Sequence, residues 1–266
     1  MFADFCSIKK NKDKHMNKLA LITGGSRGLG RDMALNIAEK GMDVVITYHS
    51  NKEAADKVVS EIREMGQQAF AFQLDTRNIK SFNAFYTVVS KILKEERGSD
   101  TIDFLINNAG TGIYKPFAEI TEADFDEMMT IHLKGVYFLT QQALAYLPDG
   151  GRIINISSGL ARFSLPGSSA YGPMKSAIET FTRYLAKELG SRGIRANVVA
   201  PGAIATEFGG GENKTNEDKR KLVAGATALG RVGEPEDIGG VVAFLCSEEA
   251  RWINGQRIEV SGGMML

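Results

Sequence analysis

Short apolar runs alternate along the chain with stretches in which apolar residues recur every three or four positions. The apolar runs are short, rich in β-branched residues and bounded by glycine or polar residues, which predicts buried strands at 19–23, 43–48, 69–74, 102–107, 152–157, 194–200 and 257–260. The intervening periodicity predicts helices over 28–41, 53–66, 81–98, 123–147, 168–189 and 235–246.

This alternation predicts an α/β fold. We expect a single Rossmann-like, doubly wound domain over residues 18–266, with a seven-stranded parallel sheet and helices on both faces. Residues 1–17 contain no apolar run that suits a secretory signal, and we expect a disordered leader there. The irregular segment 203–230 has two interpretations, a solvated loop or a lid over a site, and its length favours a lid.

Composition narrows the classes of function. The 266 residues include 32 acidic and 32 basic side chains, so the formal net charge is zero, which argues against a nucleic-acid partner. No run reaches the length of a membrane span. The two cysteines, Cys6 and Cys246, have no metal-ligand spacing, so we predict no metal site and a reducing, cytoplasmic setting.

A glycine-rich turn, TGGSRGLG at 23–30, joins the first strand to the first helix. Gly24, Gly28 and Gly30 suit a tight turn, a close approach to a pyrophosphate and helix packing on the sheet. The helix N-terminus offers N–H groups and a positive dipole end to phosphate. We therefore predict a dinucleotide site, with an ordinary strand–helix turn as the alternative.

The end of the second strand indicates which dinucleotide binds. NAD sites often place a carboxylate there, which binds the 2′-hydroxyl of the adenosine ribose, but positions 47–52 hold none. Arg27 can reach toward this ribose, and His49, Ser50 and Asn51 can donate hydrogen bonds to it. This pattern favours NADP(H) over NAD(H), although Arg27 can also be read as a solvated loop charge.

The stretch SSAYGPMKSA at 168–177 places Tyr171 and Lys175 one helical turn apart, with small residues around them. They are either surface neighbours or an acid–base couple. A free phenol has a pKa of about 10, and an ammonium about 5 Å away contributes about 3 kcal/mol, which would lower that pKa by about two. Pro173 between them is tolerated in a first helical turn.

These features together resemble the short-chain dehydrogenase/reductase family, over residues 18–266. The resemblance adds NNAG at 107–110, a serine thirteen positions before the tyrosine at Ser158, Pro201–Gly202 after the sixth strand, and RVGEPED at 231–237. The chain is most similar to the branch of 3-oxoacyl-carrier-protein reductases and glucose dehydrogenases. Relatives in that branch are commonly tetramers, so the resemblance implies a homotetramer or a dimer.

The resemblance implies an oxidoreductase that transfers hydride between NADP(H) and a small-molecule carbonyl or secondary alcohol. Tyr171 would be the acid, Lys175 would lower the pKa of the phenol and bind the nicotinamide ribose, and Ser158 would donate to the substrate oxygen. It also implies a cofactor-binding set: Gly24, Ser26, Arg27, Gly28, Leu29, Gly30, His49, Ser50, Asn51, Asp75, Thr76, Asn108, Ala109, Gly110, Tyr171, Lys175, Pro201, Gly202, Ile204 and Thr206. For Asp75, a helix N-cap is the alternative role.

One position departs from the family pattern. Members usually carry an asparagine in the long fourth helix, where it helps to hold a water that connects the lysine to solvent, and this chain has His132. A histidine can accept and donate a proton, so His132 either keeps a catalytic relay or fills the place inertly.

This departure motivates a second hypothesis, a sensor or scaffold that binds the cofactor without turnover. A methyltransferase using S-adenosylmethionine is a third. Tyr114, Phe163 and Phe208 are expected to border the pocket, but the sequence does not distinguish an acyl thioester, a sugar, a steroid or a small ketone as substrate.

Overall fold

The structure, a computed structural model, describes residues 16–266, so most of the expected leader lies outside the described residues. Within them a single sheet has seven parallel strands in the order β3-β2-β1-β4-β5-β6-β7, which confirms the expected fold class. The strands are β1 Leu19–Ile22, β2 Asp43–Tyr48, β3 Ala69–Gln73, β4 Phe104–Asn107, β5 Arg152–Ile156, β6 Arg195–Pro201 and β7 Arg257–Val260.

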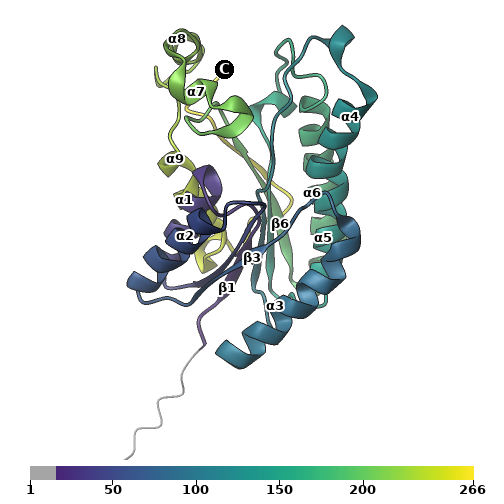
Figure 1. Cartoon of the computed structure of the whole chain (residues 1–266), viewed down its shortest axis with the longest axis vertical. Helices are drawn as coiled ribbons and strands as arrows, with labels where there is room; N and C mark the ends of the chain where they lie inside the picture. The colour runs from purple at the N-terminus through teal and green to yellow at the C-terminus, as the bar shows by residue number, and fades with distance from the viewer. Residues whose placement is uncertain (1–15) are drawn as a thin grey trace, which may run out of the picture.

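Helices cover both faces of this sheet (Figure 1). On one face α1 (Gly28–Glu39), α2 (Lys52–Glu64) and α9 (Glu236–Leu245) form one apolar cluster with the strands. On the other face α3 (Phe82–Arg97), α5 (Gly135–Ala143) and α6 (Gly172–Glu188) form a second. Every residue of β1, β2, β4 and β5 is buried, which explains why these strands are apolar with little alternation.

The strand order fixes where a ligand can enter. The chain starts at β1, runs outward through β2 and β3, and then crosses back to β4 on the other side of β1. The connections therefore diverge at the carboxyl ends of β1 and β4, which opens a crevice at that point. The glycine-rich turn follows β1, and the NNAG segment includes the end of β4.

The predicted helix over 123–147 is interrupted. It consists of α4 (Glu122–Met129), a π-helical turn η3 (Thr130–Lys134) and α5. A Cβ atom at Gly135 would lie 2.3 Å from the carbonyl oxygen of Thr76 and 2.9 Å from that of Thr130. The helix therefore packs directly on the backbone after β3, and the widened turn before Gly135 carries His132 into the interior.

The helix that carries Tyr171 begins later than expected, at Gly172 instead of 168. The Ser168 carbonyl accepts the N–H groups of Tyr171 and Gly172 at 3.1 and 2.8 Å, which closes a turn just before the helix. Tyr171 is thus the N-cap residue, and Pro173 lies in the first turn, where proline is tolerated.

The segment 203–230 is largely ordered into short helices: η6 (Phe208–Gly210), α7 (Glu212–Thr215) and α8 (Glu217–Gly225). They lie beyond the carboxyl ends of the strands, at the top of Figure 1. Ion pairs join Lys214 to Glu207 and Lys219 to Glu212, both at 2.5 Å. The remaining 3₁₀ turns are η1 (Ile79–Ser81), η2 (Phe117–Glu119), η4 (Gly159–Ala161), η5 (Gly190–Arg192) and η7 (Glu248–Ala250).

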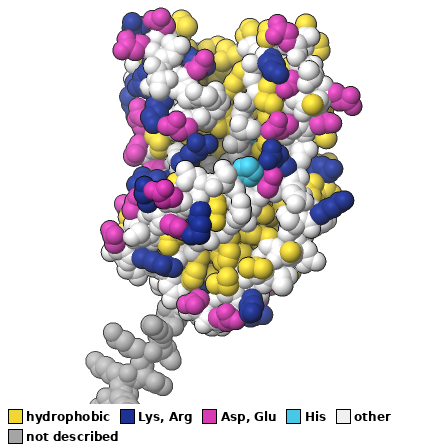
Figure 2. All heavy atoms as spheres, viewed as in Figure 1, with side chains coloured by type: hydrophobic (Ala, Val, Ile, Leu, Met, Phe, Trp, Pro, Cys, Tyr) yellow, Lys and Arg dark blue, Asp and Glu magenta, His cyan; other side chains and the backbone are white. Residues whose placement is uncertain are grey.

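Charged side chains of both signs are interspersed over the face shown in Figure 2. Many are paired along one helix or between neighbouring elements, such as Lys52 with Asp56 and Lys18 with Asp103. None of the helices found in residues 16–266 has both the length and the apolar character of a membrane span.

Candidate active site

A cavity of about 860 Å³ opens at the carboxyl edge of the sheet. It is lined by the glycine-rich turn, the segments that follow β2 to β6, and the first turn of α6. Every residue of the predicted cofactor-binding and catalytic sets lines this cavity except His132. Positions as distant in sequence as Gly24 and Thr206 therefore meet at one site.

The glycine-rich turn is held by close backbone packing. Gly24 has φ +67°, and a Cβ there would lie 2.9 Å from the Cα of Ala109. A Cβ at Gly30 would lie 2.2 Å from the Gly24 carbonyl oxygen. The Asn108 side chain fastens the turn by donating to the carbonyls of Thr23 and Gly24 at 2.9 and 3.2 Å.

The start of α1 fits a phosphate. Its N-cap, Arg27, forms no side-chain capping bond, and its first turn carries no acidic residue. The first residues of the helix, Gly28 to Gly30, line the cavity, and a helix N-terminus with free N–H groups favours an anion such as a pyrophosphate. The residues present thus fit a dinucleotide.

Where the segments after β2 and β3 line the cavity, the structure adds a residue that the sequence reasoning missed. Arg77 donates to both oxygens of Asp75, from Nε at 2.9 Å and from Nη2 at 2.9 Å, and its Nη2 lies 3.2 Å from Nε2 of His49. The side-chain hydrogen bond from Arg77 lowers the pKa of Asp75. Asp75 also accepts the backbone N–H of Arg77, so it closes a local turn, while the caps of η1 and α3 are Asn78 and Ser81. The only sequence signal for Arg77 was a basic residue two positions after the carboxylate.

The candidate catalytic side chains lie together, as the spacing predicted. Tyr171 is 5% and Lys175 6% exposed, and the Lys175 Nζ lies 5.5 Å from the centre of the Tyr171 ring. The Lys175 Nζ donates to the Ile156 carbonyl at 2.8 Å. Ser158 stands at the end of β5, where its Oγ accepts the Leu160 N–H at 3.2 Å. They are an enclosed group, not a surface pair.

Burial shifts the pKa values of this pair in opposite directions. Burial raises the pKa of Tyr171 above its ordinary value of 10, the nearby Tyr114 raises it further, and the contact with Ser158 only partly opposes this. Burial likewise lowers the pKa of Lys175 to about 7. Burial therefore opposes the expected lowering of the phenol pKa by the ammonium, because removing both groups from water disfavours both charges, and the influence of Lys175 on the phenol stays a prediction.

His132 lies behind the cavity. Its Nε2 is 2.7 Å from the Thr111 carbonyl, which can only accept, so Nε2 carries the hydrogen and Nδ1 is an acceptor. Nδ1 has no hydrogen-bond partner within residues 16–266. The ring stands perpendicular to that of Tyr171, with centroids 5.0 Å apart.

The surroundings of His132 keep it neutral. Burial lowers its pKa well below the ordinary 6.5, and the Lys175 charge adds to this, against the opposing hydrogen bond to Thr111. A Cβ at Gly110 would lie 2.7 Å from the imidazole Cε1, so the ring packs directly against the NNAG segment. A proton relay through His132 stays a prediction.

Aromatic side chains surround the phenol on its cavity side. The ring centroids of Tyr114 and Phe208 lie 6.1 and 5.8 Å from that of Tyr171. Phe163 lines the cavity as well, so the three aromatics expected at the pocket are all there. The cavity that contains Tyr171 is therefore lined in part by aromatic side chains.

Comparisons with known proteins agree with this geometry. Residues 24–265 match the family model described as Enoyl-(Acyl carrier protein) reductase. A short-chain dehydrogenase/reductase of Pestalotiopsis microspora is 36% identical over 256 residues, which cover 92% of this chain and 94% of the relative. A hydroxynaphthalene reductase-like protein of Metarhizium brunneum is 36% identical, with coverage of 92% and 94%. Among solved structures, the angucycline C-6 ketoreductase LanV with bound NADP is 38% identical, with a TM-score of 0.88 over 93% of this chain and 95% of that one.

Proposed function

The chain belongs to the short-chain dehydrogenase/reductase family, and from this premise we propose that it is an NADP(H)-dependent reductase that converts a ketone to a secondary alcohol. The observation that carries the proposal is the meeting of Ser158, Tyr171 and Lys175 in the same cavity as the glycine-rich turn. A module that only binds a nucleotide would not need an enclosed phenol and amine beside the binding site.

NADP(H) is the proposed cofactor. The glycine-rich turn and the α1 N-terminus would hold the pyrophosphate, Arg27, Ser50 and Asn51 the 2′-phosphate, and Lys175 the nicotinamide ribose. When bound, NADPH supplies the hydride. The preference for NADP(H) rests on the exposed Arg27, on the lack of a carboxylate at 47–52, and on the NADP held by LanV.

The chain's own residues would supply the proton to the substrate oxygen and stabilise the negative charge that forms there. Tyr171 keeps its hydroxyl proton at neutral pH, since its pKa is raised, and can donate it to an oxygen that becomes negative. The Ser158 hydroxyl would donate a hydrogen bond to the same oxygen. Lys175, when protonated, stabilises the negative charge that passes to the phenol oxygen.

We further propose a flat aromatic ketone as the substrate class. Tyr114, Phe163 and Phe208 offer apolar and aromatic walls beside the phenol, and aromatic rings pack favourably in offset or edge-to-face contacts. LanV and the hydroxynaphthalene reductase-like protein bear names that point to fused-ring substrates. Phe208 belongs to the segment 203–230, which we propose to be a lid over this substrate.

The domain organisation, the assembly and the location are proposed from the same family resemblance. We propose one catalytic domain over residues 18–266, a homotetramer or dimer as the working assembly, and a cytoplasmic location. Size-exclusion chromatography with light scattering would decide the assembly.

The decisive variant for the reaction is Tyr171→Phe, which removes the donated proton and keeps the ring. We expect kcat for NADPH-dependent reduction of a panel of ketones, 1-tetralone and 2-tetralone included, to fall by at least about 10²-fold. The Kd of NADPH, measured by fluorescence titration, should stay within twofold of the wild-type value.

The outcomes separate the hypotheses. Wild-type binding of NADPH with no turnover across the panel would favour the sensor or scaffold. Calorimetric binding of S-adenosylmethionine, without NADPH binding, would favour a methyltransferase. Full turnover by Tyr171→Phe would refute the assigned role of the phenol.

A further inference from the structure

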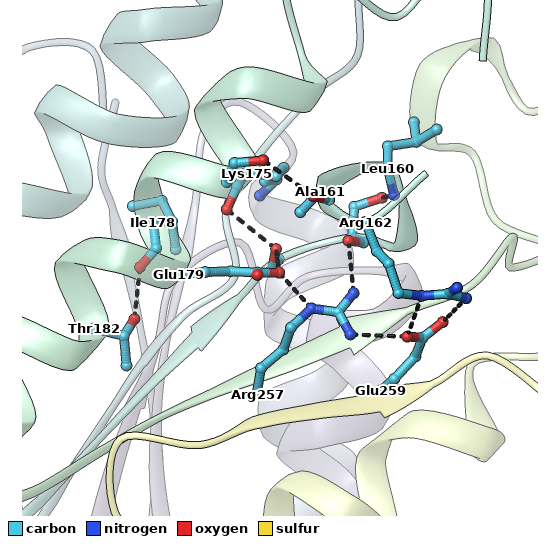
Figure 3. A network of polar contacts seen from close by, with 12 residues as sticks. Leu160, Ala161, Arg162, Lys175, Ile178, Glu179, Thr182, Arg257 and Glu259 are labelled. Atoms are coloured by element: carbon cyan, nitrogen blue, oxygen red, sulfur yellow. Dashed lines mark hydrogen bonds and ion pairs between the residues drawn. The ribbon is translucent and has the colours of Figure 1, made fainter. Parts of the chain in front are cut away.

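Four alternating charges connect the edge strand β7 to α6 and to the segment that follows η4 (Figure 3). Glu179 of α6, Arg257 and Glu259 of β7, and Arg162 after η4 form a continuous series of ion pairs, which we call the four-charge chain. The site described above makes no use of these residues. Their side chains are 13–37% exposed, so the four-charge chain is shielded from solvent more than an ordinary surface ion pair.

Arg257 is its central member and makes three separate contacts. Its Nε donates to Glu179 at 2.7 Å, and its Nη1 donates to Glu259 at 2.8 Å. Its Nη2 lies 3.4 Å from the backbone carbonyl oxygen of Ser158. A guanidinium holds its five N–H donors in one rigid plane, whereas an ammonium carries three donors on a flexible stem, so Arg257 keeps these contacts in a fixed mutual geometry.

The Glu179 end reaches the helix that carries the amine. Glu179 lies one turn beyond Lys175, and the same Oε1 that accepts from Arg257 also accepts the Ser157 hydroxyl at 2.7 Å. That hydroxyl is also 3.3 Å from the Lys175 carbonyl. Ser157, which immediately precedes the candidate serine, is therefore hydrogen-bonded to the part of α6 that carries the candidate lysine.

The opposite end reaches the C-terminal segment. Arg162 donates two hydrogen bonds of 2.9 Å to the Glu259 carboxylate. It also donates to the carbonyls of Met264 and Met265 at 2.8 and 3.1 Å. Burial opposes the charge of Glu259, but hydrogen bonds from Arg162, Arg257 and Ser261 outweigh it and lower its pKa to about 2. Glu259 thus stays charged at neutral pH.

We propose that Arg257 is a positioning residue, which sets the place of Ser158 by holding its backbone carbonyl against α6 through Glu179. This inference rests on the proposed function. It follows from the contacts because the Ser158 carbonyl belongs to the same residue as the hydroxyl that would meet the substrate oxygen. A displacement of about 1 Å at a reacting group can cost on the order of 10²-fold in rate.

The test compares Arg257→Met and Arg257→Lys with Arg192→Met. Arg192 is the matched control, since it also pairs with a carboxylate, Asp149, and donates to backbone carbonyls, those of Leu144 and Leu147, but none of these three partners lines the cavity, whereas Arg257 contacts Ser158, which does. For Arg257→Met we expect kcat for 2-tetralone, or for the best ketone of the panel, to fall about tenfold or more. The KM of the ketone and the Kd of NADPH should stay within about twofold, and Arg257→Lys should recover part of kcat.

A second readout does not depend on turnover. Hydrogen–deuterium exchange of peptides that cover residues 157–163 should be faster in Arg257→Met than in wild type and unchanged in Arg192→Met. If the wild type reduces no ketone, the proposed function fails, and exchange alone then decides whether Arg257 orders this segment. Unchanged exchange, or a kcat loss no larger than that of Arg192→Met, would overturn the inference.

Discussion

Tyr171 and Lys175 show how strongly the surroundings of a side chain control its charge. Each is nearly enclosed, and burial acts on them in opposite directions, so that the pKa of the phenol rises and that of the amine falls to about 7. At neutral pH the phenol holds its proton, and the ammonium form of the amine is disfavoured relative to that of an exposed lysine. Lys175 is thus poised to change its charge in the range where the enzyme would work.

A pH dependence of reduction follows from the lowered pKa of Lys175. The ammonium form is populated below pH about 7 and is lost above it. It can therefore stabilise a negative charge on the phenol oxygen only below that pH. We expect kcat/KM for NADPH, which reports groups of the free enzyme, to be constant below pH about 7 and to fall above it with a slope near −1. His132 should not contribute, since its pKa lies well below 6.5.

The control for this profile is Lys175→Met. It should lower the plateau and remove the break near pH 7. A wild-type profile that stays level to pH 9 would show that the charge of Lys175 does not matter for reduction.

At the scale of single residues, the sequence predicted which side chains lie together, but not their protonation states. The one-turn spacing of Tyr171 and Lys175 fixed their common face, because helical geometry is local. Burial depends on the residues packed around them, such as His132 and Tyr114, which arrive from elsewhere in the chain. Arg77 was missed for a similar reason, since only the fold brings it to His49.

Among the elements, the π-helical turn Thr130–Lys134 has the clearest local cause. It precedes Gly135, where the helix backbone meets the Thr76 carbonyl so closely that a side chain has no room. The turn therefore lies between the cavity-lining segment after β3 and the buried His132.

Gly135→Ala tests this packing. The added methyl group must displace α5 or the Thr76 backbone, and we expect a loss of about 2 kcal/mol in the free energy of unfolding, within the usual range for overpacking. Denaturant titration would measure it. Gly190→Ala is the matched control, because a Cβ at Gly190 meets nothing within 4 Å, and it should be neutral. Equal stability of the two variants would mean that the close approach at Gly135 is not a constraint.

The sequence could predict the long helices and the strands, but not this interruption. The apolar periodicity continues through 123–147, and one widened turn changes it too little to be recognised. The later start of α6 depends on the turn closed by the Ser168 carbonyl, a contact that periodicity does not register. The ion pairs of Arg257 and Glu259 were equally hidden, since both residues read simply as parts of the last strand.

Across the whole molecule, topology brings the chemistry together. Parallel strands end at one edge, so the turn after β1, the NNAG segment, Ser158 and the Pro201–Gly202 turn gather around one cavity. This much followed from the alternation of strands and helices and from the spacing of the motifs. The shape of the substrate space did not, because it depends on where Tyr114, Phe163 and Phe208 lie relative to the phenol.

The most direct test of the account is the transfer of label from NADPH that carries deuterium at both C4 positions to a ketone substrate, followed by mass spectrometry of the product. With the wild-type protein and the best ketone of the panel, we predict an alcohol that carries one deuterium on the carbinol carbon. With Tyr171→Phe, we predict almost no product although NADPH still binds. Absence of labelled alcohol with the wild-type protein across the panel, or full yield from Tyr171→Phe, would contradict the account.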